Sequence, residues 1–223
     1  MAPLRYYRST IAGISMTRLD RRWTVLLAVA VLAAAAPARP PRHTVAGHFN
    51  VPRASTPRLS GYAANVITNP RFESGNVDGG WHQCGDVRAY VTRDHPFSGS
   101  YDEYSGTANG QGEPTGNSGV CQQVTIPPGG VLTAKLFQLS NEADTTFTYQ
   151  EADLLDNRGN VVVNLYKSVN NNPSWVSGMW NLGAFAGRTY WLYFGVHGDG
   201  YSSLSTQQFL DDVRLAGSAS ARK

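Results

Sequence analysis

The stretch Phe209-Leu210-Asp211-Asp212-Val213-Arg214-Leu215, near the end of this 223-residue chain, decides how the sequence is interpreted. Strand alternation from Phe209 to Leu215 places Asp211 on the same inward face as three apolar side chains. An unpaired charge in an apolar interior is very costly, so Asp211 needs a partner. We expect that partner to be Glu73, near the start of the foldable sequence. The two carboxylates are predicted to share a cation, with calcium as the expected ion, and so to join the first and last strands.

Short strand-like segments recur on both sides of these two residues, with Gly and Asn in the turns between them and no helical period. The clearest hairpin signal is Asp156-Asn157-Arg158-Gly159-Asn160, which separates two apolar runs. The pattern predicts an all-β fold, an antiparallel β-sandwich or jelly roll, within one domain over residues 61–216. The expected strands are residues 62–68, 87–92, 101–108, 119–126, 131–139, 145–155, 161–167, 175–181, 188–197 and 207–215.

Residues 1–38 have the organisation of a secretory signal segment. Three arginines precede an apolar run over residues 23–36, and Ala36-Pro37-Ala38 follows as a small-residue exit. Met16 is well placed to be the true start. The run is shorter than the about 20 residues that a membrane span needs, and an uncleaved anchor is the alternative. We therefore expect a secreted, extracellular protein that meets a membrane only through this segment.

The folded segment is acidic although the whole chain is basic. The chain contains 19 Lys and Arg against 16 Asp and Glu, whereas residues 61–216 contain 8 against 15. Residues 39–60 are expected to be a disordered linker rich in Pro and Arg, and residues 217–223 a tail. An acidic domain suits divalent cations and not nucleic acid, so no nucleic-acid partner is expected. We expect a monomer.

Cys84 and Cys121 are the two cysteines of the chain. In an exported protein a lone pair predicts one disulfide, with two free buried thiols as the alternative. A disulfide that closes the loop between Cys84 and Cys121 raises the free energy of unfolding by about 3–4 kcal/mol in the chain-entropy model.

Several motifs then occur in a fixed order through nearly the whole domain. In that order they resemble the jelly-roll carbohydrate-binding modules related to families 4, 9 and 22, within the wider galactose-binding-like group. The motifs are Asn69-Pro70-Arg71-Phe72-Glu73, Gly80-Trp81, Phe97-Ser98-Gly99-Ser100-Tyr101, Cys121-Gln122-Gln123-Val124-Thr125-Ile126-Pro127, Leu154-Leu155-Asp156-Asn157-Arg158-Gly159-Asn160, Trp175 followed by Asn181-Leu182-Gly183-Ala184-Phe185-Ala186-Gly187-Arg188-Thr189, and the closing stretch quoted first.

The resemblance implies a structural calcium held by the opening Glu, the closing Asp and backbone carbonyls. In this chain these ligands are Glu73 and Asp211, with Ser100 as a further contributor. Asp212, which alternation turns to the other face, is the reserve. The alternative is that Glu73 caps a turn or pairs with Arg71, Arg88 or Arg214.

Sugar rings stack on exposed aromatic side chains, while amides and carboxylates bond their hydroxyls. Most aromatic residues of an all-β domain belong to the core. Alternation nevertheless separates Trp191 and Tyr193 from the apolar face of their strand. The candidate ligand-binding residues are Tyr149, Glu151, Tyr166, Trp191 and Tyr193.

No catalytic constellation is evident, so an enzyme is not expected. The histidines lack zinc spacing, and Gly116-Asn117-Ser118-Gly119 has no matching His motif. The adjacent pairs Asp102-Glu103 and Asp211-Asp212 face opposite sides of their strands. The expectation is a secreted, non-catalytic carbohydrate-binding module stabilised by calcium, whose partner is a carbohydrate or cell-surface polymer. The alternative is a secreted β-sandwich that binds a protein or the cell wall without binding sugar.

Overall fold

The computed structural model describes residues 64–107, 113, 115–201 and 204–217. The chain divides into two units, Met1–Pro37 and Ala38–Lys223, and all described residues belong to the second. The predicted signal segment and linker lie outside the described residues, as does the tail beyond residue 217. None of the described helical segments is long and apolar enough to cross a membrane.

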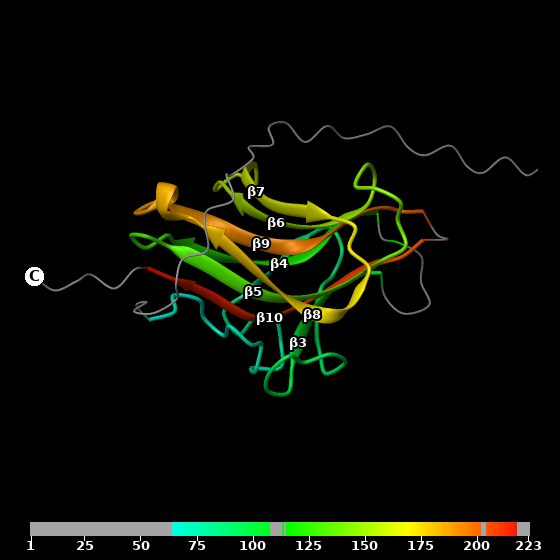
Figure 1. Cartoon of the computed structure of the whole chain (residues 1–223), viewed down its shortest axis with the longest axis horizontal. Coiled ribbons are helices and arrows are strands. Elements are labelled where there is room, and N and C mark those ends of the chain that lie inside the picture. The colour runs from blue at the N-terminus through cyan, green and yellow to red at the C-terminus, as the bar shows by residue number, and fades with distance from the viewer. Residues whose placement is uncertain (1–63, 108–112, 114, 202–203, 218–223) are drawn as a thin grey trace, which may run out of the picture. The chain divides into compact units, whose positions relative to one another are not determined.

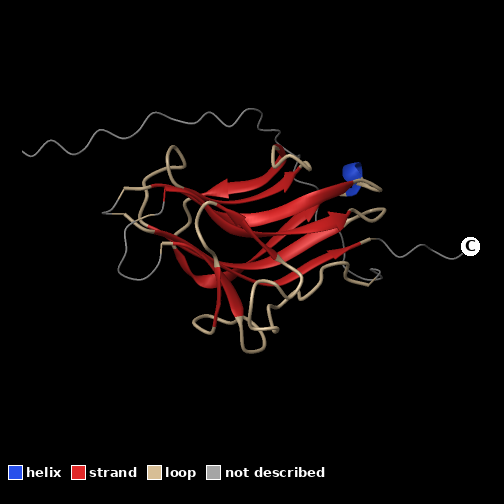
Figure 2. Ribbon diagram, turned by 180° about the vertical axis from the view of Figure 1, so that it is seen from behind, coloured by secondary structure: helices blue, strands red, loops and turns tan. Residues whose placement is uncertain are grey.

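The described part of the second unit is an antiparallel β-sandwich, so the predicted fold class is confirmed. Figure 1 and Figure 2 show the two stacked layers of strands. One sheet has the order β1-β4-β9-β6-β7 and the other β2-β3-β10-β5-β8. We name them the β9 sheet and the β10 sheet after their central strands. The strands are β1 (His82–Gly85), β2 (Tyr90–Thr92), β3 (Asp102–Gly106), β4 (Thr115–Thr125), β5 (Val131–Ser140), β6 (Tyr149–Leu155), β7 (Val161–Ser168), β8 (Asn172–Asn181), β9 (Thr189–Asp199) and β10 (Thr206–Ala216), and a 3₁₀ turn spans Gly183–Phe185.

The predicted hairpin joins β6 to β7. Asp156 Oδ1 accepts the backbone N–H groups of Arg158 (2.8 Å) and Asn160 (2.9 Å), and Gly159 has a φ of +80°. Two elements differ from the prediction. Residues 64–68 form no strand, and β1 was not expected because His82–Gly85 lacks apolar alternation.

Apolar side chains from both sheets form the core between them. Trp81 and Phe72 are almost fully buried there, with ring centroids 5.3 Å apart, and Trp81 lies 6.5 Å from Phe194 of β9. Part of the interior is polar instead. Gln138 donates to Gln208 Oε1 at 2.9 Å, and the Tyr166 hydroxyl donates to the same oxygen. The sandwich therefore contains buried hydrogen-bonded side chains as well as an apolar core.

The alternation predicted for β10 is wrong. Phe209 and Asp211 pair with Phe137 and Lys135 of β5 and lie on the outer face of the β10 sheet. The register then shifts between Asp211 and Arg214, and Asp212 has a φ of +48°. This β-bulge turns Val213 and Leu215 into the core, so they do not share a face with Asp211.

Cys84 and Cys121 form the predicted disulfide, with Cα atoms 5.7 Å apart. The bond joins β1, at the edge of the β9 sheet, to β4. It therefore fixes a four-residue edge strand to its neighbour.

Candidate functional site

Two predicted residues from opposite ends of the domain hold one loop between β2 and β3. Asp211 Oδ2 accepts the backbone N–H groups of Phe97 (2.9 Å) and Ser98 (2.8 Å). Glu73 Oε1 accepts those of Ser100 (2.9 Å) and Tyr101 (3.2 Å). Glu73 therefore caps this loop, which was one of the alternatives for its role. We call residues 97–101 the clamped loop.

Gly99 lies between the two pairs of donors, with a φ of +75°. A Cβ at this position would lie 2.2 Å from Glu73 Oε1, so only glycine allows the carboxylate to approach the loop. Burial raises the pKa of Asp211 to about 6, against the effect of its backbone hydrogen bonds with Ser98, Asp212 and Phe97.

The ligands around these two carboxylates decide whether the predicted calcium fits. Calcium takes six to eight oxygens, whereas five backbone N–H groups face these two carboxylates, the fifth being that of Asp212. In the described ranges no group of three or more Asp, Glu, His or Cys side chains could hold a metal ion. Ser100 supplies its N–H, and Asp212 Oδ1 accepts the Ser98 hydroxyl at 3.3 Å. The residues as placed do not form an oxygen cage for calcium, and calcium stays a prediction of the sequence.

The outer face of the β9 sheet, turned away from the core, carries four of the five candidate ligand residues. Tyr149 and Glu151 lie on β6, and Trp191 and Tyr193 on β9. The register places them on one face, because Glu151 lies opposite Gly195 and Leu155 opposite Trp191. Their neighbours along each strand, such as Ala152, Leu154, Leu192 and Phe194, belong to the core.

Tyr166 does not belong to this face. It pairs with Ala152 on the core side of the sheet and stacks on Trp180, with ring centroids 5.7 Å apart. Its hydroxyl is used inside the sandwich, by Gln208. The structure therefore separates Tyr166 from the other four candidates.

The aromatic rings of the outer β9 face are fixed by their surroundings. A Cβ at Gly195 would lie 2.2 Å from Tyr193 Oη, and one at Gly119 would lie 2.6 Å from Tyr193 Cε2. These glycines let the Tyr193 ring lie flat on the sheet. Tyr149 stacks on His197, with centroids 4.9 Å apart, and Trp191 is partly exposed beside His82.

A carboxyl pair lies beside these rings. Glu151 and Asp153, 8% and 1% exposed, share a hydrogen bond, and Asn164 Nδ2 donates to Asp153 Oδ1 at 2.7 Å. Burial raises the pKa of Asp153 to about 6 and that of Glu151 well above its usual value. Because they share a hydrogen bond, the two carboxyl groups are closer than the about 5–9.5 Å between those of glycoside hydrolases.

Sequence reasoning did not name Asp153, Asn164 or Lys167 as site residues. Alternation from Glu151 places Asp153 on the same face, so that signal was present. Asn164 and Lys167 could not be placed, because the register of β6 and β7 shifts between Ala152 and Asp153. Lys167 Nζ lies 3.3 Å from the centre of the Tyr149 ring.

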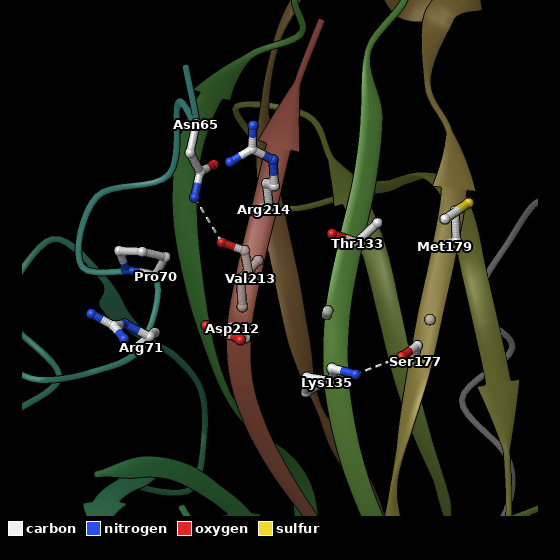
Figure 3. Close-up of a pocket in the computed structure, with 12 residues that line it drawn as sticks. Asn65, Pro70, Arg71, Thr133, Lys135, Ser177, Met179, Asp212, Val213 and Arg214 are labelled. Carbon is white, nitrogen blue, oxygen red and sulfur yellow. Dashed lines mark hydrogen bonds between the residues drawn. The ribbon is translucent and has the colours of Figure 1, made fainter. Parts of the chain in front are cut away.

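The outer face of the β10 sheet carries a different set of side chains. Aligned aromatic residues cross it, one on each strand: Tyr90, Tyr104, Phe209, Phe137 and Trp175. His95 stacks on Phe137 at 4.5 Å, and Phe97 of the clamped loop packs on Trp175 at 5.7 Å. A groove of about 520 Å³ lies on the same sheet (Figure 3). We call it the β10 groove; its polar lining includes Arg71, Thr133, Lys135, Ser177, Asp212 and Arg214.

No protein-family model and no curated protein matches this chain. Solved structures do match its fold. The K3 adhesin domain of Lys-gingipain from Porphyromonas gingivalis is 14% identical, with a TM-score of 0.50 over 69% of this chain and 100% of that domain. The module TmCBM61, solved with β-1,4-galactotriose, is 17% identical, with a TM-score of 0.49 over 69% of this chain and 98% of that one. The CBM22-1 xylan-binding domain of Paenibacillus barcinonensis Xyn10C is 15% identical, with a TM-score of 0.45 over 73% of this chain and 100% of that one.

At these identities the likeness concerns the fold alone, and the K3 domain supports the two-sheet sandwich. Carbohydrate-binding modules with a β-sandwich fold are among the structures that match. The β-sandwich fold that the sequence resemblance implied is confirmed by the strand topology.

Proposed function

We propose that this chain is an exported, non-catalytic carbohydrate-binding module and that a saccharide binds at the outer face of the β9 sheet. The observation that supports this proposal most is the combination, on one face, of fixed aromatic rings with a hydrogen-bonded carboxyl pair. Apolar sugar faces suit aromatic rings, and sugar hydroxyls suit groups that both donate and accept hydrogen bonds.

Each part of this face has a role in the proposal. Trp191 is partly exposed and offers a ring to the apolar side of a sugar. Glu151 is 8% exposed, and its hydrogen bond with the more buried Asp153 holds it on this face. The two carboxyl groups share a hydrogen bond, which leaves no space between them for the glycosidic bond that the acid and base of a glycosidase flank. Binding without hydrolysis is the chemistry that this arrangement supports.

Export and calcium complete the proposal. The disulfide supports export, because such bonds persist in oxidising compartments. Sequencing the N-terminus of the secreted protein tests cleavage after residue 36 or 38. Calcium at Glu73 and Asp211 is retained as a prediction, and the chelator experiment given in the Discussion tests it.

Isothermal titration with soluble neutral polysaccharides, including β-1,4-galactan and xylan, tests the saccharide proposal. Trp191→Ala should weaken binding about tenfold, the size expected for loss of one stacking contact. Trp175→Ala is the matched control, because it removes a partly exposed Trp from the other sheet. Thermal melts of both variants verify that they fold.

Two results would contradict the proposal. An equal loss of affinity in the two variants would exclude the β9 face as the site. If no polysaccharide binds, the alternative of a protein or cell-wall partner without sugar binding takes its place.

A further inference from the structure

The β10 groove gathers positive charge in an acidic domain. Residues 61–216 contain 8 Lys and Arg against 15 Asp and Glu. Three of the eight basic residues, Arg71, Lys135 and Arg214, line this groove, against a single acidic one, Asp212. We propose that the groove is a second binding site, which takes a saccharide bearing carboxylate or sulfate groups. This inference does not depend on binding at the β9 face.

The β-bulge of β10 shapes the groove. Between Asp211 and Arg214 the backbone of β10 leaves its pairing with β5. The N–H of Val213 instead donates to Pro70 O at 2.9 Å, and Val213 O accepts from Asn65 Nδ2 at 3.0 Å (Figure 3). The groove is lined by this bulged segment, the residues that pair with it, and the faces of β5 and β8. The course of the backbone at the bulge therefore forms the groove, which is more than a gap between surface side chains.

The basic side chains are spread along the groove. Figure 3 shows Arg214 beside Asn65, Lys135 beside Ser177, and Arg71 on a third side. Lys135 is held in place, since its Nζ donates to Ser177 Oγ at 2.8 Å and lies 4.4 Å from the centre of the Phe97 ring. Separated cations match a ligand with several acidic groups better than one small anion.

The rest of the lining indicates a hydroxylated ligand. Thr133 and Ser177 provide hydroxyl groups, and Asn65 provides an amide. Guanidinium groups bind carboxylate and sulfate oxygens through paired N–H donors. A volume of about 520 Å³ lies within the about 300–1,000 Å³ of small-molecule sites. Acidic groups on a hydroxyl-rich chain, as in a uronic-acid or sulfated oligosaccharide, satisfy these features together.

Isothermal titration of the full chain with oligogalacturonate, sulfated dextran and neutral dextran tests this proposal. EDTA in the buffer prevents calcium from bridging the ligands. We expect an anionic probe to bind, with a loss of affinity of about tenfold in Lys135→Gln and in Arg71→Gln. Any binding of neutral dextran should be the same in these variants as in the wild type. Arg71 is exposed and outside the strands, so its variant keeps the test valid if Lys135→Gln fails to fold. Which anionic probe binds identifies the acidic group.

Arg158→Gln is the matched control, because it removes the same charge from the exposed β6–β7 turn. It should leave affinity within about twofold. An equal loss of affinity in Arg158→Gln and Arg71→Gln would show that the probe is attracted by the charge of the whole protein, and would overturn the groove as a site. The absence of binding to both anionic probes would also overturn it. Trp191→Ala should not affect anionic binding, so failure of the β9-face proposal and failure of this one are distinguishable.

Discussion

Glu73 and Asp211 act on the same five-residue loop, although 137 positions separate them in the sequence. Their proximity was predictable, because both are acidic residues in motifs of the opening and closing stretches. The groups that their carboxylates bind were not predictable. The clamped loop supplies N–H groups, and its conformation depends on Gly99 and on a bulge at Asp212 that the apolar pattern of β10 does not reveal.

Removing either carboxylate should loosen the clamped loop. Asp211→Ala leaves three backbone N–H groups without their acceptor, and each unsatisfied buried group costs about 1–3 kcal/mol. We expect urea unfolding to show a loss of at least about 2 kcal/mol, and a smaller loss for Glu73→Ala, because Glu73 is exposed. Asp78→Ala, at another exposed acidic residue, is the control. Wild-type stability in Asp211→Ala would show that the loop does not depend on this carboxylate.

The same proteins decide the calcium prediction. If a cation contributes, EDTA should lower the wild-type melting temperature reversibly and leave both alanine variants unchanged. A ligand at a hundredfold excess over its Kd stabilises a folded protein by about 2.7 kcal/mol. An unchanged wild-type melt would mean that the N–H groups hold the loop without calcium.

Among the elements, long strands with clear alternation were the most predictable. β9 was expected over residues 188–197 and spans Thr189–Asp199, with Trp191 and Tyr193 on the face away from the core, as alternation indicated. The β6–β7 turn was also expected, because Asp156 and Gly159 are typical turn residues. β1 was not predicted because it lacks alternating apolar residues, and the disulfide instead holds this edge strand in its sheet.

The disulfide should stabilise β1 in particular. Cys84→Ser with Cys121→Ser should lower the free energy of unfolding by about 3–4 kcal/mol in the chain-entropy model. Hydrogen exchange should accelerate at the amides of His82–Gly85, since among the described strands this edge strand pairs with β4 alone. Reductant should destabilise the wild type and have no effect on the double variant. Equal unfolding midpoints for the two proteins would contradict this role.

For the molecule as a whole, buried carboxyl groups set the pH dependence of stability. Burial raises the pKa of Glu103 and Glu151 well above their usual values and that of Asp153 to about 6. Glu103 is fully buried, and its Oε2 has no hydrogen-bond partner among the described residues. A group whose folded pKa exceeds its unfolded pKa binds more protons when folded. Stability should then rise as pH falls through the folded pKa toward the unfolded value near 4.

Thermal melts from pH 8 to pH 5 test this dependence. The melting temperature should increase toward pH 5, and Glu103→Gln should flatten the change by removing one titrating group. Asp156→Asn is a useful contrast, because the pKa of this partly exposed turn carboxyl is lowered by its hydrogen bonds with Asn160. A melting temperature that falls steadily between pH 8 and pH 5 would contradict the assignment.

The distribution of charge could be predicted for the whole molecule but not for its faces. The acidic balance of residues 61–216 is a simple count. Arg71, Lys135 and Arg214 are far apart in the sequence, and their convergence on one groove depends on strand order and on the bulge. The Tyr166 prediction failed for the same reason, since pairing with Ala152 turns its ring inward.

The hydrogen bonds that join the two ends of the described domain also determine how it would respond to tension. Val66 N donates to Leu215 O at 2.9 Å, and the Asn65 side chain bonds both Leu215 N and Val213 O. These contacts run antiparallel, so a pull on residues 64 and 217 would open them one after another and not together. Once they part, force reaches β10, the central strand of its sheet. A domain tethered through both ends would therefore yield by unzipping at low force, whereas one held by a single end would keep its sandwich intact.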